Sequence, residues 1–201
     1  MAKIIYDGEK FQVHSDVYEP DEDTYLLLEN LSIGQGETFL EIGTGPGINS
    51  IVAAEEGGTG ISTDISKKAL KCAEKNAKNH EVEDKIEFRK GNLFEPIKKD
   101  EIFDLIIFNP PYLPIEEDEK LKTDLSKAWD GGPAGREIID EFLENFEKYL
   151  KKNGKILLLH SSLANKEKTL KKLEEKKFKV NIYEKKSFFE NIFLFEGIRR
   201  R

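Results

Sequence analysis

The chain has 201 residues, of which 38% are hydrophobic and 35% are charged, and its formal net charge is −7. This length fits one globular domain with a sizeable core, and the net negative charge argues against the general basic field that draws proteins onto nucleic acid. The lone cysteine, Cys72, excludes an internal disulfide and a multi-cysteine zinc site, and the absence of a leader-like or membrane-length apolar run leads us to expect a cytoplasmic protein without membrane contact.

The N-terminal part is predicted to be a short lead-in followed by a helix. Residues 3–17 are expected to form an extended or hairpin-like segment, and the acidic stretch 18–24 precedes a run of leucines. Pro20 suits the first turn of a helix, where the acids beside it complement the helix dipole. On local physics alone, this segment is a well-started helix that packs its leucines into the core.

A strand, a glycine-rich turn and a helix follow one another between residues 38 and 54. The turn carries Gly43, Gly45 and Gly47, which let the backbone approach a ligand beside the free N–H groups of a helix N-terminus. Their spacing differs from that of dinucleotide sites, which place a pyrophosphate on the helix. Because Glu41 before the turn would repel a pyrophosphate but accept an amino group or ribose hydroxyls, the loop favours a nucleoside cofactor with a positively charged tail.

Asp64 stands at the carboxyl end of the next predicted strand, residues 60–65. An acid in this place can bind the hydroxyls of a ribose. The competing interpretation is a cap for helix 67–79, but Ser66 can cap that helix itself, which leaves Asp64 for a ligand.

Residues 85–90 alternate apolar and charged side chains, which predicts a half-buried strand at the edge of the sheet. After this strand, Asn92 can hydrogen-bond an adenine edge, with Leu93 or Phe94 stacked beside the base. An asparagine in a plain turn explains the same residues nearly as well.

The apolar run 103–108 predicts a buried central strand, and Asn109-Pro110-Pro111-Tyr112 follows it directly. Two prolines cannot extend the strand, because neither has an N–H for the ladder and each fixes φ. The chain therefore leaves the sheet at Asn109 and presents a carboxamide, backbone carbonyls and an aromatic ring. In open α/β sheets, ligands bind at this carboxyl end of the strands.

The segment 113–134 is long and polar and carries Trp129 and several glycines, so we interpret it as a lid or a substrate-binding loop. The remaining expected elements are helix 136–152, strand 154–160, helix 164–177, and two antiparallel strands, 178–183 and 191–196. His160 is expected to have a structural role, and no set of metal ligands is visible.

These elements predict an α/β fold: a single Rossmann-like domain, residues 1–201, with a seven-stranded, mostly parallel sheet, a C-terminal antiparallel hairpin and helices on both faces. The motifs together resemble the class I S-adenosylmethionine-dependent methyltransferases. The stretches 18–28 and 128–137 and the Asn-Pro-Pro-Tyr motif are most similar to the release-factor glutamine methyltransferases, the HemK/PrmC-like group, in their short archaeal–eukaryotic form.

The resemblance implies S-adenosyl-L-methionine as cofactor, no metal, a lead-in and cofactor-lid helix over residues 1–33, and a substrate loop over 113–135. The cofactor contacts that it implies are Tyr18, Asp23, Thr24, Glu41, Gly43, Gly45, Gly47, Asp64, Ile65, Asn92, Leu93 and Asn109. The substrate contacts are Asn109, Pro110, Pro111, Tyr112 and Trp129, and the catalytic residues among them are Asn109, Pro110 and Tyr112. Asn92 departs from the acid more usual in the family, since it keeps an acceptor for the adenine amino group but lacks the charge.

A planar –NH₂ group is a poor nucleophile, because its lone pair is delocalised. The Asn109 side-chain carbonyl and the Pro110 main-chain carbonyl can each accept one N–H of such a group, which orients the nitrogen and offsets its developing positive charge. Tyr112 would pack against the flat target. By resemblance, the target is the glutamine of the Gly-Gly-Gln loop of a class 1 peptide release factor, and the product is N5-methylglutamine.

Other functions stay open. Adenine N6-methylation of DNA or RNA uses the same –NH₂ geometry, although the charge of −7 and the lack of a basic, aromatic-interleaved patch argue against it. Protein lysine methylation and a cofactor-binding scaffold without activity are further alternatives. The resemblance also implies a small zinc-binding activator subunit, for which the edge strand 85–90 is the natural docking place.

Overall fold

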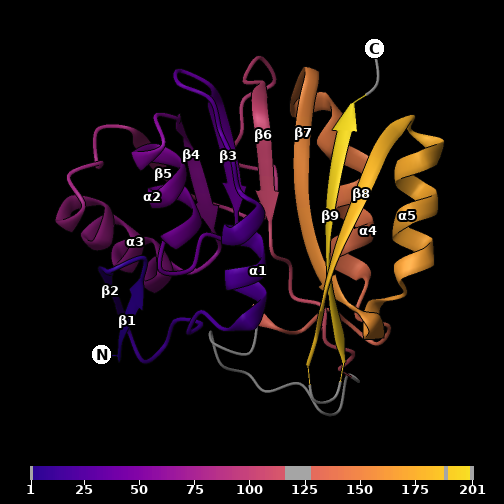
Figure 1. The fold of residues 1–201 in the computed structure, drawn as a ribbon, viewed down its shortest axis with the longest axis horizontal. Coiled ribbons are helices and arrows are strands. Elements are labelled where there is room, and N and C mark those ends of the chain that lie inside the picture. The colour runs from indigo at the N-terminus through magenta and orange to yellow at the C-terminus, as the bar shows by residue number, and fades with distance from the viewer. Residues whose placement is uncertain (1, 116–127, 188–189, 200–201) are drawn as a thin grey trace. The chain divides into compact units, whose positions relative to one another are not determined.

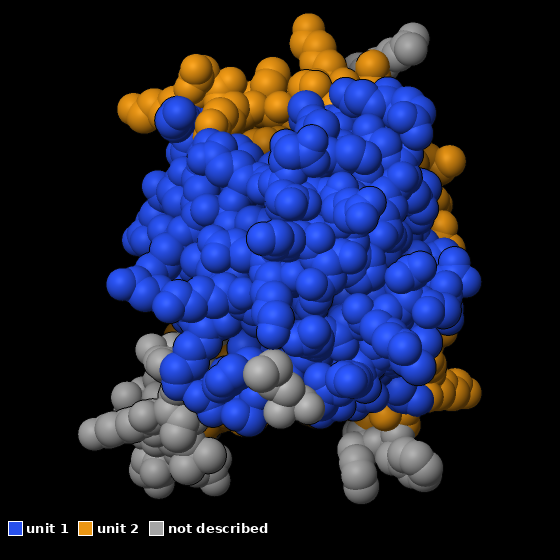
Figure 2. Space-filling model, turned by 90° about the vertical axis from the view of Figure 1, so that its left-hand side faces the viewer, with its two compact units in different colours: residues 1–98 blue, residues 99–201 orange. Residues whose placement is uncertain are grey.

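The computed structural model describes residues 2–115, 128–187 and 190–199, so that part of the predicted substrate loop, residues 116–127, lies outside the described residues. The chain divides into two compact units, Met1–Lys98 and Lys99–Arg201, which Figure 2 shows in blue and orange. No helix among the described residues is both long enough and apolar enough to cross a membrane.

The first unit contains an antiparallel hairpin, parallel strands and the helices between them (Figure 1). Its elements are β1 (Ala2–Tyr6), β2 (Glu9–Val13), α1 (Glu22–Asn30), β3 (Thr38–Ile42), α2 (Ile48–Glu55), β4 (Thr59–Asp64), α3 (Lys67–Asn79) and β5 (Ile86–Lys90). The parallel strands lie in the order β5-β4-β3. Both crossovers step in the same direction, and their right-handedness puts α2 and α3 on one face of these strands, where the two helices contact each other.

The hairpin β1–β2 packs on α3, and the predicted hairpin-like lead-in is therefore confirmed. Ile4, Val13 and Val17 form a small buried cluster with Ala69 of that helix. This satellite core fixes the N-terminal strands to the helix that follows β4.

Local capping explains where the first helices begin. The Ser66 hydroxyl accepts hydrogen bonds from the backbone N–H groups of Lys68 and Ala69, so α3 starts where the sequence predicts. Helix α1 starts later than predicted, because the carboxylate of Asp21 accepts from the Glu22 N–H at 2.8 Å and acts as the N-cap. The placement of Pro20 in the first helical turn is wrong, since this residue precedes the cap.

The second unit contains β6, β7 and a C-terminal antiparallel pair, with helices in the crossovers (Figure 1). Its elements are β6 (Phe103–Phe108), α4 (Glu137–Asn145), the 3₁₀ turn η2 (Phe146–Tyr149), β7 (Leu150–Ser161), the 3₁₀ turn η3 (Ser162–Ala164), α5 (Lys166–Glu175), β8 (Phe178–Lys186) and β9 (Asn191–Arg199). The strands follow the order β6-β7-β9-β8. The predicted C-terminal hairpin is confirmed, because β9 is antiparallel to both β7 and β8.

The predicted helix 136–152 is wrong at its end, because α4 stops at Asn145 and β7 begins at Leu150. The sequence offers no stop signal there, since the first glycine is Gly154 and the apolar spacing continues through Phe146. Ring packing explains the change to a 3₁₀ turn: Phe146 stacks on Phe142 with centroids 5.3 Å apart and meets Phe178 of β8 at 5.2 Å.

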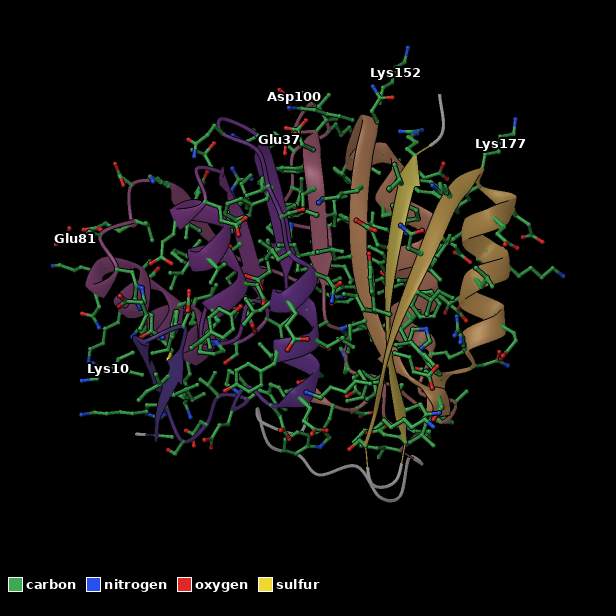
Figure 3. The ribbon with its side chains drawn as sticks, viewed as in Figure 1. Lys10, Glu37, Glu81, Asp100, Lys152 and Lys177 are labelled. Carbon is green, nitrogen blue, oxygen red and sulfur yellow. The ribbon has the colours of Figure 1, made fainter. Side chains whose placement is uncertain are left out.

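The seven strands of the main sheet follow the order β5-β4-β3-β6-β7-β9-β8, and β1 and β2 form a sheet of their own. The predicted fold class, a mostly parallel seven-stranded sheet with a C-terminal antiparallel hairpin, is confirmed, and β5 is an edge strand as predicted. Charged side chains such as Lys10, Glu81 and Lys177 point outward (Figure 3), as expected for a heavily charged surface.

Candidate active site

The glycine turn of the first unit lies between β3 and α2, as the sequence predicts. Gly43, Gly45 and Gly47 have φ values of 69°, 54° and 88°, in the left-handed region that favours glycine. A Cβ at Gly47 would lie 2.9 Å from the Cβ of Ala73, so this glycine lets α3 approach the turn. A Cβ at Gly45 would meet no atom of its surroundings within 4 Å, so the backbone there faces open space that a ligand can enter.

Glu41 lies beneath this turn and is only 1% exposed. Its carboxylate accepts hydrogen bonds from the Thr44 hydroxyl at 2.6 Å, the Asn49 amide at 2.9 Å, and the Ser50 hydroxyl. Burial raises the pKa of the Glu41 carboxyl to about 7, although these hydrogen bonds lower it. In this structure, Glu41 therefore holds the turn and the first turn of α2 together.

Asp64 lies at the carboxyl end of β4, beside the glycine turn. Its carboxylate accepts from the backbone N–H of Gly45 at 3.0 Å and of Ser66 at 2.8 Å. Burial raises the pKa of this carboxyl, and the two backbone donors oppose the shift. Each oxygen keeps a second lone pair for a hydroxyl group. The sequence did not indicate these backbone bonds, which orient the carboxylate.

Ile65 and the segment after β5 complete this end of the strands. Ile65 is 42% exposed and offers an apolar surface for a flat ring. The Gly91 N–H donates to the Asp64 carbonyl at 3.2 Å, which brings Asn92 to the same end of the sheet. Leu93 has a φ of 43° and is buried.

The three predicted contacts in the lid segment lie together at the start of α1. The Tyr18 hydroxyl donates to Asp23 at 3.1 Å, and the Thr24 N–H donates to the other oxygen of the same carboxylate at 2.6 Å. Asp23 and Thr24 are buried. Asp23, which the sequence analysis assigned to the helix dipole, therefore also holds the Tyr18 hydroxyl in place.

The Asn109-Pro110-Pro111-Tyr112 motif belongs to the second unit and directly follows β6, as predicted. Leu113 then pairs with the segment around Trp129: its N–H donates to the Trp129 carbonyl at 2.9 Å, and the Gly131 N–H donates to the Leu113 carbonyl at 3.0 Å. Trp129 therefore lies beside the motif in the chain's described part, and its side chain is partly exposed.

Glycines allow the segment after Trp129 to lie close to the backbone of the Asn109-Pro110-Pro111-Tyr112 motif. A Cβ at Gly131 would lie 2.9 Å from the Cα of Tyr112, and a Cβ at Gly135 would collide with the Tyr112 carbonyl oxygen. The glycines at Gly132 and Gly135 have φ values of 79° and 64°. The segment Gly131–Gly135 therefore packs directly against the backbone of Tyr112.

Sequence reasoning does not indicate several of the buried hydrogen bonds. In the second unit, Arg136 is buried and donates to the Asn165 carbonyl at 2.9 Å and to the Thr169 hydroxyl at 3.0 Å. That hydroxyl in turn donates to His160 Nε2 at 2.8 Å, and His160 Nδ1 donates to the Ser161 carbonyl. Burial lowers the pKa of His160 to about 4, so its ring is neutral and structural.

In the first unit, Asn76 of α3 is missed as well, and its side chain donates to the Pro46 carbonyl within the glycine turn at 2.9 Å. Only an asparagine in the middle of a Lys-rich helix marks it in the sequence. Among the described residues, no group of three or more His, Cys, Asp and Glu side chains is placed to hold a metal ion.

Comparison with known proteins identifies the family. A family model described as a methyltransferase domain matches residues 33–195. A putative protein N5-glutamine methyltransferase of Methanocaldococcus jannaschii is 45% identical over 180 residues, which are 89% of this chain and 89% of that protein. The methyltransferase HEMK2 of Homo sapiens is 34% identical over 173 residues, with 81% of this chain and 79% of that protein covered.

The solved structures include the Mtq2–Trm112 complex of E. cuniculi, described as responsible for methylation of the translation termination factor eRF1. It matches with a TM-score of 0.65 and 26% identity, and the match covers 92% of this chain and 99% of that chain. Family model, relatives and fold agree, and the chain belongs to the S-adenosylmethionine-dependent methyltransferases of the HemK type.

Proposed function

We propose that the protein transfers a methyl group from S-adenosylmethionine to the side-chain amide nitrogen of a glutamine, in the Gly-Gly-Gln loop of a class 1 peptide release factor. The observation that carries the proposal is similarity along most of the chain to protein-glutamine methyltransferases, together with the Asn-Pro-Pro-Tyr motif after β6. Translation takes place in the cytoplasm, which is the compartment that we propose.

The residues of the first unit fit the cofactor. Gly45 opens the backbone to a ligand, Asp64 offers two oriented oxygens to the ribose hydroxyls, and Ile65 offers an apolar face to the adenine. Gly43, Gly47, Asn92 and Leu93 line the same strand ends, and Tyr18, Asp23 and Thr24 are proposed to cover the methionine part. When bound, the cofactor supplies an electrophilic methyl group on a positively charged sulfur.

The Asn109-Pro110-Pro111-Tyr112 motif is proposed to bind the acceptor. The Asn109 side-chain carbonyl and the Pro110 carbonyl each accept one N–H of the amide, which orients the nitrogen and stabilises the positive charge that develops on it. Tyr112 and Trp129 pack against the flat group and the peptide around it. No strong base is needed, because the amide nitrogen is positively charged once it carries the new methyl group, and a proton on it is then acidic enough to be lost to water.

The Mtq2–Trm112 complex contains two proteins, which supports a partner for this chain too. We propose that a small zinc-binding activator adds to the free edge of β5, whose side chains Glu87 and Lys90 are exposed. Hydrogen exchange in a purified complex would show protection of the amides in Ile86–Lys90. Unchanged exchange there, with a formed complex, would place the partner elsewhere.

Labelled-methyl transfer tests the substrate. We expect transfer to a class 1 release factor and loss of transfer when its Gly-Gly-Gln glutamine is replaced, with tRNA, DNA and histone-like proteins as parallel acceptors. Methylation of a nucleic acid with a steep salt dependence would favour the adenine alternative instead. Transfer to lysine in the histone-like protein would favour the lysine alternative.

A further inference from the structure

We propose that Asn76 is a positioning residue for the cofactor, because it ties the glycine turn to the N-terminal hairpin. The inference rests on the proposed role of the glycine turn in binding S-adenosylmethionine. It assigns a function to a residue of α3 that lies outside the turn itself.

Asn76 is fully buried, at 0% exposure, and the hydrogen bonds that its side chain makes to described residues all go to backbone groups. Its Nδ2 group donates to the Pro46 carbonyl at 2.9 Å and to the Gln12 carbonyl at 2.8 Å. Its Oδ1 atom accepts from the Gln12 N–H at 2.9 Å. One carboxamide therefore uses both of its N–H donors and its oxygen to join two segments that are far from it in sequence.

On the side of the turn, Pro46 stands between Gly45 and Gly47, which both need a positive φ. Proline has no N–H, so its carbonyl is its only backbone group for hydrogen bonding. One turn earlier on α3, Ala73 contacts Gly47 so closely that a Cβ there would not fit. The packing of Ala73 against Gly47 and the hydrogen bond from Asn76 to Pro46 together fix the distance between the glycine turn and α3.

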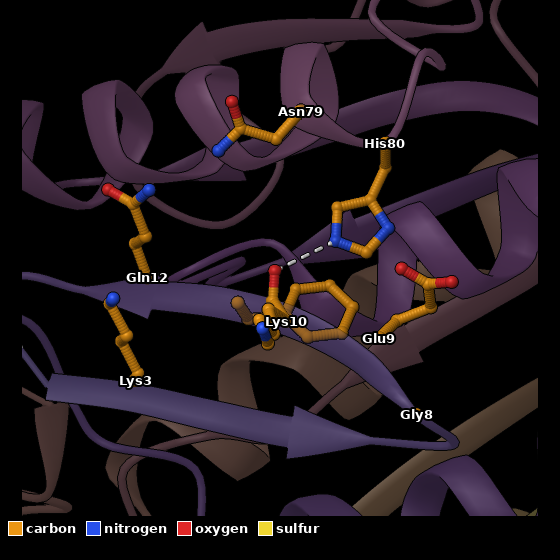
Figure 4. Close-up of a pocket in the computed structure, with 8 residues that line it drawn as sticks. Lys3, Gly8, Glu9, Lys10, Gln12, Asn79 and His80 are labelled. Atoms are coloured by element: carbon orange, nitrogen blue, oxygen red, sulfur yellow. Dashed lines mark hydrogen bonds between the residues drawn. The ribbon is translucent and has the colours of Figure 1, made fainter.

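On the side of the hairpin, two side chains of α3 and that of its C-cap residue, His80, hold β2. Cys72 Sγ donates to the Gln12 carbonyl at 3.1 Å, next to the Asn76 bonds. The ring of His80 stacks on Phe11 at 4.3 Å, and its Nε2 lies 3.2 Å from the Lys10 carbonyl, as the dashed line in Figure 4 shows. The proposed lid contacts begin at Tyr18, a few residues after β2 ends. Asn76 is therefore bonded both to the glycine turn and to the strand that precedes the lid.

An aspartate has the shape of asparagine but no N–H donors. Asn76→Asp would place a carboxylate against the carbonyl oxygens of Gln12 and Pro46, and all three oxygens would repel one another. The turn should loosen, so we expect the Kd and KM for S-adenosylmethionine to rise roughly tenfold. The kcat at saturating cofactor and the KM for the acceptor should stay nearly unchanged.

The matched control is Asn79→Asp, which makes the same substitution on the same helix at the exposed residue that lines the pocket in Figure 4. Calorimetry measures S-adenosylmethionine binding by the full chain without any acceptor. Wild-type affinity in Asn76→Asp overturns the inference alone, and so does an equal loss in Asn79→Asp. A wild type that binds no S-adenosylmethionine overturns the cofactor site as well.

Circular dichroism establishes whether Asn76→Asp folds. If it does not, hydrogen exchange of the wild type tests the inference instead, because the backbone amide of Gln12, in the hairpin, donates to the Asn76 side chain. S-adenosylmethionine should slow exchange at that amide several-fold through the shared carboxamide. Exchange that is unchanged at saturating cofactor overturns the inference.

Discussion

The Glu41 carboxylate accepts a hydrogen bond from the Thr44 hydroxyl at 2.6 Å, across the start of the glycine turn. Its other oxygen accepts from Asn49 in α2 at 2.9 Å. The acid therefore bridges the strand, the turn and the helix that follows. Since it is buried, its protonation affects the stability of the cofactor turn itself.

Glu41 should make the protein less stable as the pH rises. Burial raises its pKa from 4.5 to about 7, so the folded state holds a proton that the unfolded state has lost between these values. Its contribution to the free energy of unfolding is present below pH 4.5 and declines by on the order of 3 kcal/mol as the pH rises through 7. Urea melts of wild type and Glu41→Gln across this range measure the difference. Parallel curves for the two proteins would contradict the assignment.

His160 should make the protein less stable as the pH falls, which is the opposite of the effect of Glu41. Burial lowers its pKa from 6.5 to about 4, so the unfolded state binds a proton that the folded ring does not accept. Its contribution is present above pH 6.5 and is lost as the pH falls through 4, again by on the order of 3 kcal/mol. His160→Gln should remove this loss. Because the two slopes oppose each other between pH 4.5 and 6.5, these two groups nearly cancel in the wild type, and each variant should reveal the other's slope.

Asp64→Asn should weaken the cofactor site. The variant keeps the shape, but its amide nitrogen cannot accept from Gly45 or Ser66 and carries no charge for the ribose hydroxyls. We expect the Kd for S-adenosylmethionine to rise by about tenfold or more, measured by calorimetry. Asp84→Asn, at an exposed position before β5, is the control and should bind as the wild type does.

Sequence patterns predict what depends on neighbours in the chain. The limits of α3, its Ser66 cap and the exit of the chain at Asn109 follow from local chemistry, and the structure has all three. The end of α4 does not follow, because the packing of Phe146 on Phe178 decides it. The bonds of Asn76 are likewise invisible beforehand, since they join groups 30 and 64 residues apart.

Asn109→Ala should separate binding from chemistry. The variant loses the side-chain carbonyl proposed to accept one N–H of the target amide. Turnover should fall by about a hundredfold or more at saturating cofactor, because the nitrogen is no longer oriented. The Kd for S-adenosylmethionine should change little. Turnover close to that of the wild type would remove the proposed role.

Gly135→Ala should damage methyl transfer through Tyr112. The new Cβ would collide with the Tyr112 carbonyl, and the positive φ of 64° adds a cost of about 1–2 kcal/mol. We expect at least about tenfold slower transfer with cofactor affinity retained. The control is Gly36→Ala, which has a φ of 77° but no atom within 4 Å of its Cβ. An equal loss of transfer in the control would assign the effect to backbone strain alone.

The two backbone N–H groups that hold Asp64 mean that folding, and not the ligand, sets the direction of its carboxylate. A nucleoside then meets a preorganised acceptor, and little side-chain entropy is lost when it binds. For inhibitor chemistry, a rigid ribose mimic with two hydroxyl groups should gain more affinity here than a flexible chain with the same donors.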